Sequence, residues 1–418
     1  MKNIDVIGGG TIAHIRCHLG LVAPAFGATA KQLFGLLDKY DNYRKCLYLT
    51  KMADSNSSLE TNEDVSCLLD KLIENPDTKL IFFNPALVDY EASVAISGAM
   101  GTEWGDLPTI SGKYEPRLKT SEGEQKLLLT PAPKLISKIR KDRKDIFLVG
   151  FKTTCGLSEN EQFLSGLHLL KSSSCNLVLA NDVKTRVNMI ITPEQARYTV
   201  TVDRELALSD LVKMAIARSQ STFTRSEIVE GVPVPWSDES VPEALRKVVN
   251  HCIKNGAYKP FEGKTVGHFA VKLDNKTFLT SRRNTNFNNL DKVGLVEVES
   301  TGLNNVVAYG SKPSVGGQSQ RIIFSEHPEM DCIVHMHIKH KPNAILSHRS
   351  QKGVECGSHE CGKNTSNGLR EEVPGIKCVF LDKHGPNIVF NKSIDPNKVI
   401  KFIDDNFDFD KSTDDLRG

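Results

Sequence analysis

The sequence predicts an α/β protein whose N-terminal part is built on a Rossmann-like, mostly parallel sheet. Apolar runs typical of buried strands recur through the first half of the chain, at 4–7, 79–88, 145–151 and 176–180. Segments with helical spacing lie between them, at 28–40 and 159–171. Because strands alternate with helices, we expect parallel strands that are covered by helices on both faces.

Length and composition limit the class of protein. The chain has 418 residues, more than one core usually holds, so we expect two or three domains. A net charge of +2 gives no basic field for nucleic acid or for an anionic membrane. No apolar run is long enough to span a bilayer, and the first residues do not resemble a secretory signal. Ten scattered cysteines do not suggest a disulfide framework, which favours the cytoplasm.

Glycines follow the first predicted strand. In parallel sheets ligands bind beyond the carboxyl ends of the strands, so residues at these ends are candidates for a binding site. Gly8, Gly9, Gly10 and Thr11 form a glycine-rich segment whose backbone N–H groups can approach a phosphate, especially with a helix following. A glycine turn is also a simple way to leave a buried strand, so both interpretations remain open.

A predicted strand in the second half carries two histidines. Ile333 and Val334 are β-branched, and His335 and His337 follow with one residue between them. Alternate side chains share a face of a strand, so the two imidazoles point the same way. Zinc binds neutral imidazole at about 2.0–2.1 Å, and a catalytic site takes three protein ligands and keeps one position open. The alternative is a histidine pair that is hydrogen-bonded to solvent or backbone.

A later His384-Gly385 pair lies between two apolar runs. With this pair the chain resembles the class II aldolase/adducin family, over roughly Val241 to Phe407. Further matches follow in the order of the family, namely a helix at 243–253 and the segments 267–271, 278–281, 312–314 and 355–358.

This resemblance implies an α/β/α domain and a metal-dependent lyase or epimerase for a small phosphorylated carbonyl compound. The implied ligands of zinc, or of another divalent transition metal, are His335, His337 and His384. The implied phosphate contacts lie on two turns, at Thr280, Ser281 and Ser314. Sites of this fold are generally completed by a neighbouring subunit, so the resemblance also implies a homo-oligomer, with a tetramer favoured.

One position departs from the family pattern. Family enzymes carry an acidic residue shortly after the second phosphate turn, and the corresponding position is Gly316. Without a carboxylate, proton abstraction next to a carbonyl lacks its usual base. Gln318 cannot titrate, and Glu326 and Glu329 are the nearest acids that follow in the sequence.

Two further clusters admit two interpretations each. Arg282 and Arg283 follow the first phosphate turn and are either a solvated charged pair or an anion clamp, since guanidinium binds phosphate in a fork. Cys356, His359 and Cys361 are suitable zinc ligands, but a distant fourth ligand is not evident and the aligned family turn explains the first cysteine.

The first half resembles a second family, the phosphopantothenate–cysteine ligases, over roughly Met1 to Ser219. The matching segments are 9–11, 118–121, 149–152 and 179–183, together with Asp89. Family members join a carboxylate to cysteine through an acyl-nucleotide intermediate, with CTP or ATP and magnesium. The implied nucleotide site comprises Gly8, Gly9, Gly10, Thr11, Asp89, Phe151 and Lys152. The implied catalytic residues are Lys119 for the phosphates and Asn181 for the acyl intermediate.

Here too the chain departs from the pattern. The loop of the family that approaches the substrate phosphate is replaced by 20–24, and the expected glutamate is Thr154. Such changes fit either an altered substrate or a retained fold without synthetase activity.

Prolines and small polar residues separate the two halves. We expect a nucleotide-binding domain at 1–219, a linker at 220–241 in which Trp236 docks on a domain, a metal domain at 242–407 and a frayed acidic tail at 408–418. Three functions follow as hypotheses: a metal-dependent lyase or epimerase fused to a nucleotide-binding domain, which we favour, an acyl-nucleotide ligase with a structural aldolase-like domain, or a non-catalytic scaffold.

Overall fold

The computed structural model describes residues 1–95, 109–302 and 304–413. The chain divides into two compact units. The first comprises 1–156, 165–188 and 201–215, and the second comprises 157–164, 189–200 and 216–418. Within the described ranges, no helix has both the length and the apolar character needed to cross a membrane.

A seven-stranded sheet has the strand order β12-β11-β10-β9-β5-β1-β4. Its strands are β1 (Asn3–Gly10), β4 (Arg44–Leu49), β5 (Thr78–Ala86), β9 (Phe147–Thr154), β10 (Leu177–Asp182), β11 (Asn188–Ile191) and β12 (Arg197–Thr201). The pairs β1–β4, β1–β5, β5–β9 and β9–β10 are all parallel. The α/β class and the parallel sheet are therefore confirmed.

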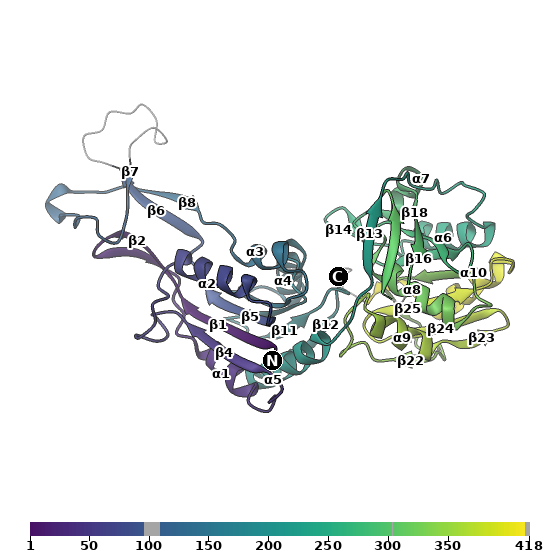
Figure 1. Ribbon diagram of the computed structural model, residues 1–418, viewed down its shortest axis with the longest axis horizontal. Coiled ribbons are helices and arrows are strands. Elements are labelled where there is room, and N and C mark those ends of the chain that lie inside the picture. The colour runs from purple at the N-terminus through teal and green to yellow at the C-terminus, as the bar shows by residue number, and fades with distance from the viewer. Residues whose placement is uncertain (96–108, 303, 414–418) are drawn as a thin grey trace. The chain divides into compact units, whose positions relative to one another are not determined.

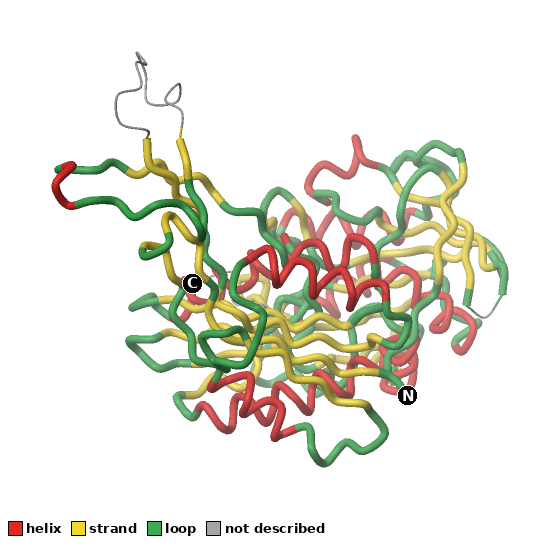
Figure 2. Tube along the Cα trace, turned by 60° about the vertical axis from the view of Figure 1, so that its left-hand side comes forward, coloured by secondary structure: helices red, strands yellow, loops and turns green. Residues whose placement is uncertain are grey.

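The helices of this region are α1 (Ala28–Leu36), α2 (Asn62–Glu74), α3 (Ile136–Asp142), α4 (Glu159–Ser172) and α5 (Arg204–Ser219). Two of them, α1 and α4, lie at the predicted segments 28–40 and 159–171, and the other three were not predicted. In Figure 1, α1 lies on one side of the strands and α2 and α3 lie on the other. Figure 2 shows the same layering, with helices above and below the strands.

The glycine-rich segment is a strand, not a turn that leads into a helix. We expected the first strand to end at Ile7, but β1 continues to Gly10, and a hairpin of β2 (Ile12–Arg16) and β3 (Leu19–Val22) follows it. A Cβ atom on Gly8 would lie 2.3 Å from Cβ of Ala30. Glycine is thus needed at this position because α1 packs directly on the strand.

A second small sheet of the first unit has the order β7-β6-β8. It comprises β6 (Tyr90–Ala95), β7 (Thr109–Ile110) and β8 (Leu127–Pro131), with a short helix η2 (Thr120–Glu122). Ile15 of β2 forms an apolar cluster with Ala92 and Val94 of β6, and Leu118 packs against it. Figure 1 shows these strands leading away from the seven-stranded sheet.

A ten-stranded sheet forms the centre of the second unit, in the order β13-β19-β18-β17-β16-β20-β25-β24-β22, with β23 paired to β24. Its strands are β13 (Arg225–Val229), β16 (His268–Lys272), β17 (Thr277–Ser281), β18 (Leu295–Ser300), β19 (Asn305–Tyr309), β20 (Cys332–His335), β22 (His348–Arg349), β23 (Arg370–Val373), β24 (Ile376–Leu381) and β25 (Gly385–Phe390). The unit also contains two separate two-stranded sheets. One pairs β14 (Pro260–Phe261) with β15 (Lys264–Thr265), and the other pairs β21 (Ile338–His340) with β26 (Phe407–Ser412).

The helices of this unit cover both faces of the sheet. They are α6 (Glu243–Lys254), η3 (Phe287–Asn289), α7 (Leu290–Val293), α8 (Val315–Glu326), α9 (His359–Gly368) and α10 (Pro396–Asn406). Phe269 and Val334 belong to one apolar layer, with side chains of α6 and α10. Ala270 and Ile333 belong to the other layer, with side chains of α8. Since alternate residues share a face, His335 points to the α8 side with Ile333.

The predicted linker and tail both contain strands. Strand β13 lies within 220–241 and pairs in parallel with β19. Trp236 is buried and makes an edge contact with Phe269, with 5.6 Å between the ring centroids, so its predicted docking is confirmed. The expectation that residues 408–412 fray was wrong, because β26 pairs with β21 and buries Phe407.

Candidate metal centre

Three neighbouring strands bring one row of polar side chains together. In antiparallel register, His268 of β16 lies opposite His335 of β20, and His335 lies opposite Asn387 of β25. Directly opposite residues of antiparallel strands have Cβ atoms about 4.5–5.5 Å apart on the same face. The row therefore points to the α8 side of the sheet, where the next row of the same strands is apolar.

Two glycines allow the backbone to close around these histidines. A Cβ atom on Gly267 would lie 2.6 Å from the carbonyl oxygen of His335, and one on Gly385 would lie 2.1 Å from that of Met336. Both glycines have positive φ, 101° and 111°, which other residues rarely adopt. The glycine of the His384-Gly385 pair is thus explained by close backbone approach next to His337.

The three predicted ligands converge. One candidate ligand atom from each of His335, His337 and His384 lies within 4.8 Å of the other two, and all three residues are buried. Among the described residues no other such group of three histidine, cysteine or acidic side chains occurs. Sequence spacing alone could not bring His384 to the strand with the other two; the pairing of β20 with β25 does.

Hydrogen bonding leaves nitrogen atoms of the triad available. Nδ1 of His335 donates to the carbonyl oxygen of Pro386 (2.8 Å), so its Nε2 carries a lone pair, and this buried atom has no described hydrogen-bond partner. Nε2 of His384 contacts the Cys356 thiol (3.7 Å), while its buried Nδ1 has no described partner. Buried polar atoms without partners are costly and therefore uncommon, so a ligand that satisfies them is the simplest explanation.

Electrostatics keeps two of these imidazoles, His335 and His384, neutral. Burial lowers the pKa of His335 to about 4, and the hydrogen bond to Pro386 opposes this effect in part. Burial also lowers the pKa of His384 well below its ordinary value, and the neighbouring His335 and His337 lower it further. Neutral imidazole is the form that binds a metal, and three nitrogens with an open position are the donor set of a catalytic zinc ion. The residues present therefore fit a zinc or similar transition-metal ion.

Residues at the end of β26 form hydrogen bonds with the backbone of two triad histidines. The Ser412 hydroxyl and the Thr413 backbone N–H both donate to the carbonyl oxygen of His337 (3.0 Å each). The Thr413 hydroxyl also reaches the carbonyl oxygen of His384 (3.4 Å). Residues that we expected to be a loose tail thus fix the backbone of two candidate ligands.

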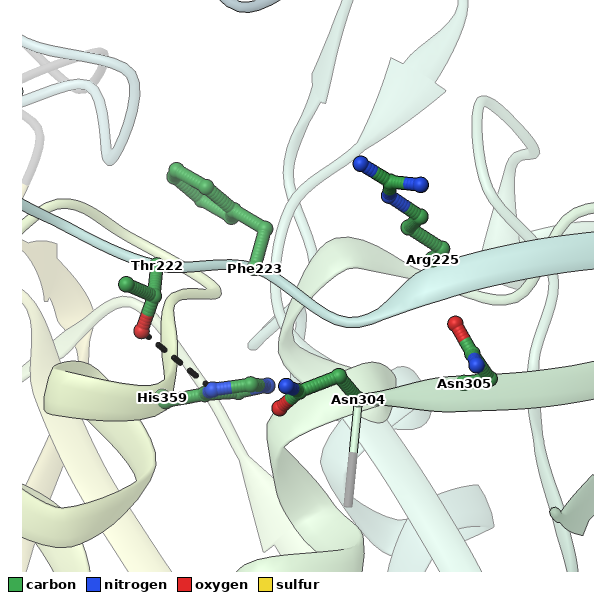
Figure 3. Close-up of a pocket in the computed structure, with 6 residues that line it drawn as sticks. All are labelled: Thr222, Phe223, Arg225, Asn304, Asn305 and His359. Atoms are coloured by element: carbon green, nitrogen blue, oxygen red, sulfur yellow. Dashed lines mark hydrogen bonds between the residues drawn. The ribbon is translucent and has the colours of Figure 1, made fainter. Parts of the chain in front are cut away.

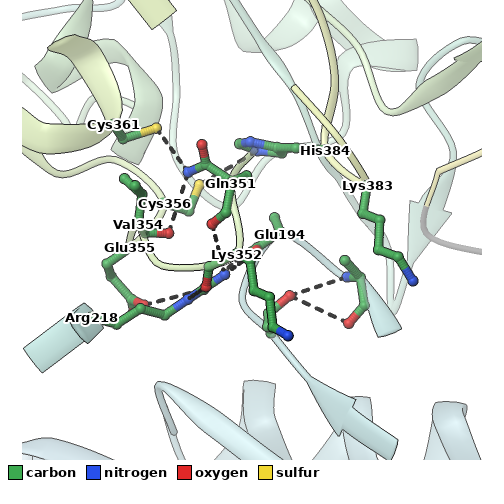
Figure 4. Close-up of polar contacts among 12 residues, drawn as sticks. Glu194, Arg218, Gln351, Lys352, Val354, Glu355, Cys356, Cys361, Lys383 and His384 are labelled. Carbon is green, nitrogen blue, oxygen red and sulfur yellow. Dashed lines mark hydrogen bonds and ion pairs between the residues drawn. The ribbon is translucent and has the colours of Figure 1, made fainter. Parts of the chain in front are cut away.

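A buried ion cluster holds the loop that carries Cys356. The guanidinium of Arg218 pairs with Glu194 (2.6 Å) and Glu355 (3.4 Å) and donates to the carbonyl oxygens of Gln351 (3.2 Å) and Lys352 (3.0 Å). Burial lowers the pKa of Arg218, but the two carboxylates outweigh this effect and keep the side chain charged, with a pKa above the ordinary value. Figure 4 shows the loop between this cluster and His384.

The residues predicted to bind phosphate lie on two joined turns. Arg283 N–H donates to the carbonyl oxygen of Lys312, and Ser314 N–H donates to that of Ser281 (3.0 Å each). The Ser281 hydroxyl is buried without a described partner, and the Arg283 side chain is exposed. The Thr280 hydroxyl is instead bonded to Gln320 (3.0 Å).

The pair Arg282-Arg283 does not act as one clamp. Arg282 donates to the Ser311 hydroxyl (2.9 Å) and to the carbonyl oxygen of Val293 (2.7 Å), so its guanidinium is occupied within the fold. Of the two arginines, Arg283 therefore remains as a predicted phosphate contact, beside Ser281 on the same turn.

The acids nearest in sequence have other partners. Gly316 lies in the first turn of α8, and the side chains of 315–319 are outside the described part. Glu326 is ion-paired with Lys363, and Glu329 with Lys377. Neither acid belongs to the group of converging ligand atoms.

The described residues do not form the second zinc site that the sequence suggested at Cys356, His359 and Cys361. His359 is bonded to the hydroxyls of Thr224 (2.7 Å) and Thr222 (3.3 Å) and lines an open hollow of about 540 Å³ (Figure 3). Cys361 accepts a hydrogen bond from Gln351 (3.3 Å), and Cys356 faces His384. These three side chains do not converge.

The predicted nucleotide residues lie at or beside the carboxyl ends of β1, β5, β9 and β10. Thr11 donates to Asn62 (2.7 Å) and accepts from the backbone N–H of Val88 (3.0 Å), and Asp89 is exposed and paired with Lys134 (2.5 Å). Register places Asn181 opposite Thr153 and Ala180 opposite Lys152. Phe151 is half-buried on β9, and Lys119 is exposed at the start of η2.

Thr154, at the position of the missing glutamate, has a local role. Its hydroxyl donates to Asp182 (2.9 Å), whose other carboxylate oxygen accepts from the backbone N–H groups of Gly156, Lys184 and Thr185. This buried aspartate therefore serves the turn after β10 and has little capacity left for a metal or substrate.

Sequence reasoning missed three residues beside the triad. It noted His268 only as a family position and gave no role to Asn387 or Gln320. These residues come together through strand register and through the packing of α8, and neither can be predicted from local sequence.

Comparisons with known proteins agree with both resemblances. Residues 247–395 match the family model of the Class II Aldolase and Adducin N-terminal domain. A 73-residue stretch is 34% identical to the Coenzyme A biosynthesis bifunctional protein CoaBC of Thermococcus kodakarensis, and covers 17% of this chain and 18% of that protein. The chain thus spans about a fifth of the length of this curated relative.

Two solved structures show weaker likeness. The DNA/pantothenate metabolism flavoprotein from Streptococcus pneumoniae has 19% identity and a TM-score of 0.43, over 52% of this chain and 97% of that chain. An L-fuculose 1-phosphate aldolase has 15% identity and a TM-score of 0.31, over 40% and 83%. At such scores neither likeness bears on function. The chain therefore contains a stretch similar to a coenzyme A biosynthesis bifunctional protein and a domain that the Class II Aldolase and Adducin N-terminal domain model matches at 247–395.

Proposed function

We propose that the protein is a metal-dependent lyase or epimerase for a small phosphorylated carbonyl compound. The observation that supports this most strongly is the buried triad of His335, His337 and His384, in which Nε2 of the first and Nδ1 of the last have no described partner. Zinc is the favoured ion, because three imidazole nitrogens with an open fourth position suit it.

Each group of this site has a separable task. The ion, when bound, polarises a carbonyl oxygen as a Lewis acid. Ser281, Arg283 and Ser314, on the two joined turns, hold the phosphate, with guanidinium matching its charge and planar oxygen pairs. The base is not local, because Gly316 carries no acid and Glu326 and Glu329 are paired elsewhere. We therefore assign it to another subunit of a homo-oligomer, with a tetramer favoured.

Exchange of substrate hydrogen with deuterated water tests this proposal directly. Proton NMR of dihydroxyacetone phosphate should show loss of the C–H signal next to the carbonyl with the zinc-loaded protein. The chelator-treated protein should not exchange, and re-addition of zinc should restore the rate. Purified protein that binds no divalent ion would refute the proposal and would favour a non-catalytic scaffold.

A second candidate function rests on the first unit. The side-by-side placement of Asn181 and Thr153, with Lys152 on the same strand, supports a nucleotide site at the carboxyl end of the sheet. We propose that CTP or ATP binds there with magnesium, either for acyl-nucleotide ligase chemistry or as a linked substrate. Calorimetry with each nucleotide and magnesium is the test, and no heat at millimolar concentrations would leave a structural domain.

Assembly and location complete the proposal. Light scattering should give a mass several times 46.2 kDa if the base comes from a partner subunit. All ten cysteines are free thiols, which supports a reducing compartment such as the cytoplasm. A monomer with full exchange activity would contradict the assembly and would place the base within one chain.

A further inference from the structure

A fourth buried histidine stands beside the triad. His268 lies directly across the strand pair from His335, with 4.9 Å between the ring centroids and 37° between the ring planes. It is only 8% exposed.

His268 does not belong to the ligand sphere itself. Ligand atoms of His335, His337 and His384 lie within 4.8 Å of one another, and His268 is not a member of this group. His268 therefore lies next to the ligand group without being part of it, a position that suits a contact to a molecule bound at the triad.

Two residues behind His268 fix which of its nitrogens carries the proton. The Thr280 hydroxyl lies 3.0 Å from Oε1 of Gln320, to which it donates, and 3.2 Å from the carbonyl oxygen of Phe269. Nε2 of the same Gln320 amide faces Nδ1 of His268, and an amide nitrogen can only donate, so Nδ1 accepts. With Nδ1 accepting, the neutral ring carries its proton on Nε2.

We propose that His268 is a catalytic residue whose Nε2–H donates a hydrogen bond to the carbonyl oxygen of the substrate held at the triad. This inference rests on the proposed function. When the bond next to the carbonyl breaks, negative charge develops on that oxygen, and a buried N–H group held in place beside the triad stabilises the charge without reorganisation. Gln320 and Thr280 act as positioning residues, because they set the tautomer without touching the substrate.

Acetohydroxamate is a suitable probe, because it presents such an anionic oxygen to a zinc ion. Calorimetry on the zinc-loaded full-length protein should give binding at least about tenfold weaker for His268→Phe, or about 1.4 kcal/mol. His268→Gln, which keeps an N–H near the position of Nε2, should recover part of this loss. His348→Phe, at an exposed histidine of the same unit, is the matched control and should bind as the wild type does.

Zinc content separates a donor from a ligand. His268→Phe should keep the full zinc content of the wild type. A loss of zinc in this variant would make His268 a fourth ligand and would overturn the proposal. Equal hydroxamate affinity in the wild type and in His268→Phe would overturn it as well, while leaving the metal site and the proposed function intact. Absence of zinc in the wild type would instead defeat the proposed function.

The tautomer has its own readout, which needs no substitution of His268. Nitrogen-15 NMR of histidine-labelled protein should show the His268 proton on Nε2. Gln320→Met should produce a mixture of tautomers and a few-fold loss of hydroxamate affinity, with unchanged zinc content. A proton on Nδ1 in the wild type would reverse the hydrogen bonds that run from Thr280 through Gln320 to His268, and it would refute the donor role.

Discussion

The second unit buries two polar clusters that share one loop. Around Arg218, the cation faces Glu194 and Glu355, and its remaining N–H groups reach backbone carbonyls. At the triad, Nε2 of His335 and Nδ1 of His384 are buried and have no described partner. The loop 351–356 contacts the first cluster through Gln351 and the second through Cys356 (Figure 4).

This difference separates structural from functional burial. A polar group with every partner in place stabilises one conformation, and removal of a single member leaves an uncompensated charge. A neutral ring with an unused nitrogen costs less to bury and can gain a partner from outside the chain. Substitution in the two clusters should therefore affect different properties. In the Arg218 cluster it should lower stability, and in the triad it should weaken ligand binding.

The largest expected effect is on the compensated cluster. Arg218→Met leaves two buried carboxylates without their cation and should lower the free energy of unfolding by about 3–5 kcal/mol. Denaturant unfolding measures this loss. Arg225→Met, at an exposed arginine of the same unit, should change it by less than about 0.5 kcal/mol. A loss below about 1 kcal/mol for the first variant would mean that the cluster is not desolvated.

Asp5 in the first unit is a buried carboxyl group whose oxygens have no described hydrogen-bond partner, unlike the carboxylates around Arg218. Burial raises the pKa of Asp5 to about 6 from 3.8, although Cys46, Arg44 and Thr78 offset it in part. The folded state thus favours the protonated form, so stability is greatest below about pH 4 and falls as pH rises to about 6. Asp5→Asn removes this dependence and should gain up to about 3 kcal/mol over wild type above pH 6. Urea melts at pH 4 and 7 test this, and the exposed Asp38→Asn should show no such difference.

The triad should show its effect only through its ligand. Zinc at a hundred times its dissociation constant should stabilise the wild type by about 2.7 kcal/mol, and this gain should vanish in His335→Ala. Thermal melts with and without zinc, together with metal analysis, measure it. His348→Ala, an exposed histidine outside the triad, should keep the full zinc response. Full metal occupancy in His335→Ala would show that the ligand assignment is wrong.

The smallest expected effect concerns the hydrogen bond from Ser412 to the backbone of His337. Ser412→Ala removes one hydrogen bond to the carbonyl oxygen of His337 and should cost about 1 kcal/mol. Zinc affinity should fall by a few-fold, because His337 loses part of its support. A truncation that removes only 414–418 keeps this bond and serves as the control. Equal affinity in Ser412→Ala would mean that the strand pairing of β26 suffices.

Local sequence determined a large part of this picture. Alternating strands and helices predicted the parallel sheet, and the His-x-His spacing predicted two imidazoles on one face, because side-chain direction in a strand follows from backbone geometry alone. The His384-Gly385 pair was recognised through resemblance, and its glycine is explained by the 2.1 Å approach of the Met336 carbonyl to a Cβ at that position.

Tertiary structure alone decided the rest, since it depends on which distant segments become neighbours. The extension of β1 to Gly10 follows from its pairing with β5, in which Gly10 lies opposite Ala86, and the order of 407–413 follows from the pairing of β26 with β21. The place of His268 beside His335 depends on the register of β16 and β20, where a shift by one residue would turn the ring to the opposite face. Periodicity carries the direction of a side chain, whereas its neighbours depend on pairings that close long loops and gain their free energy only in the assembled core.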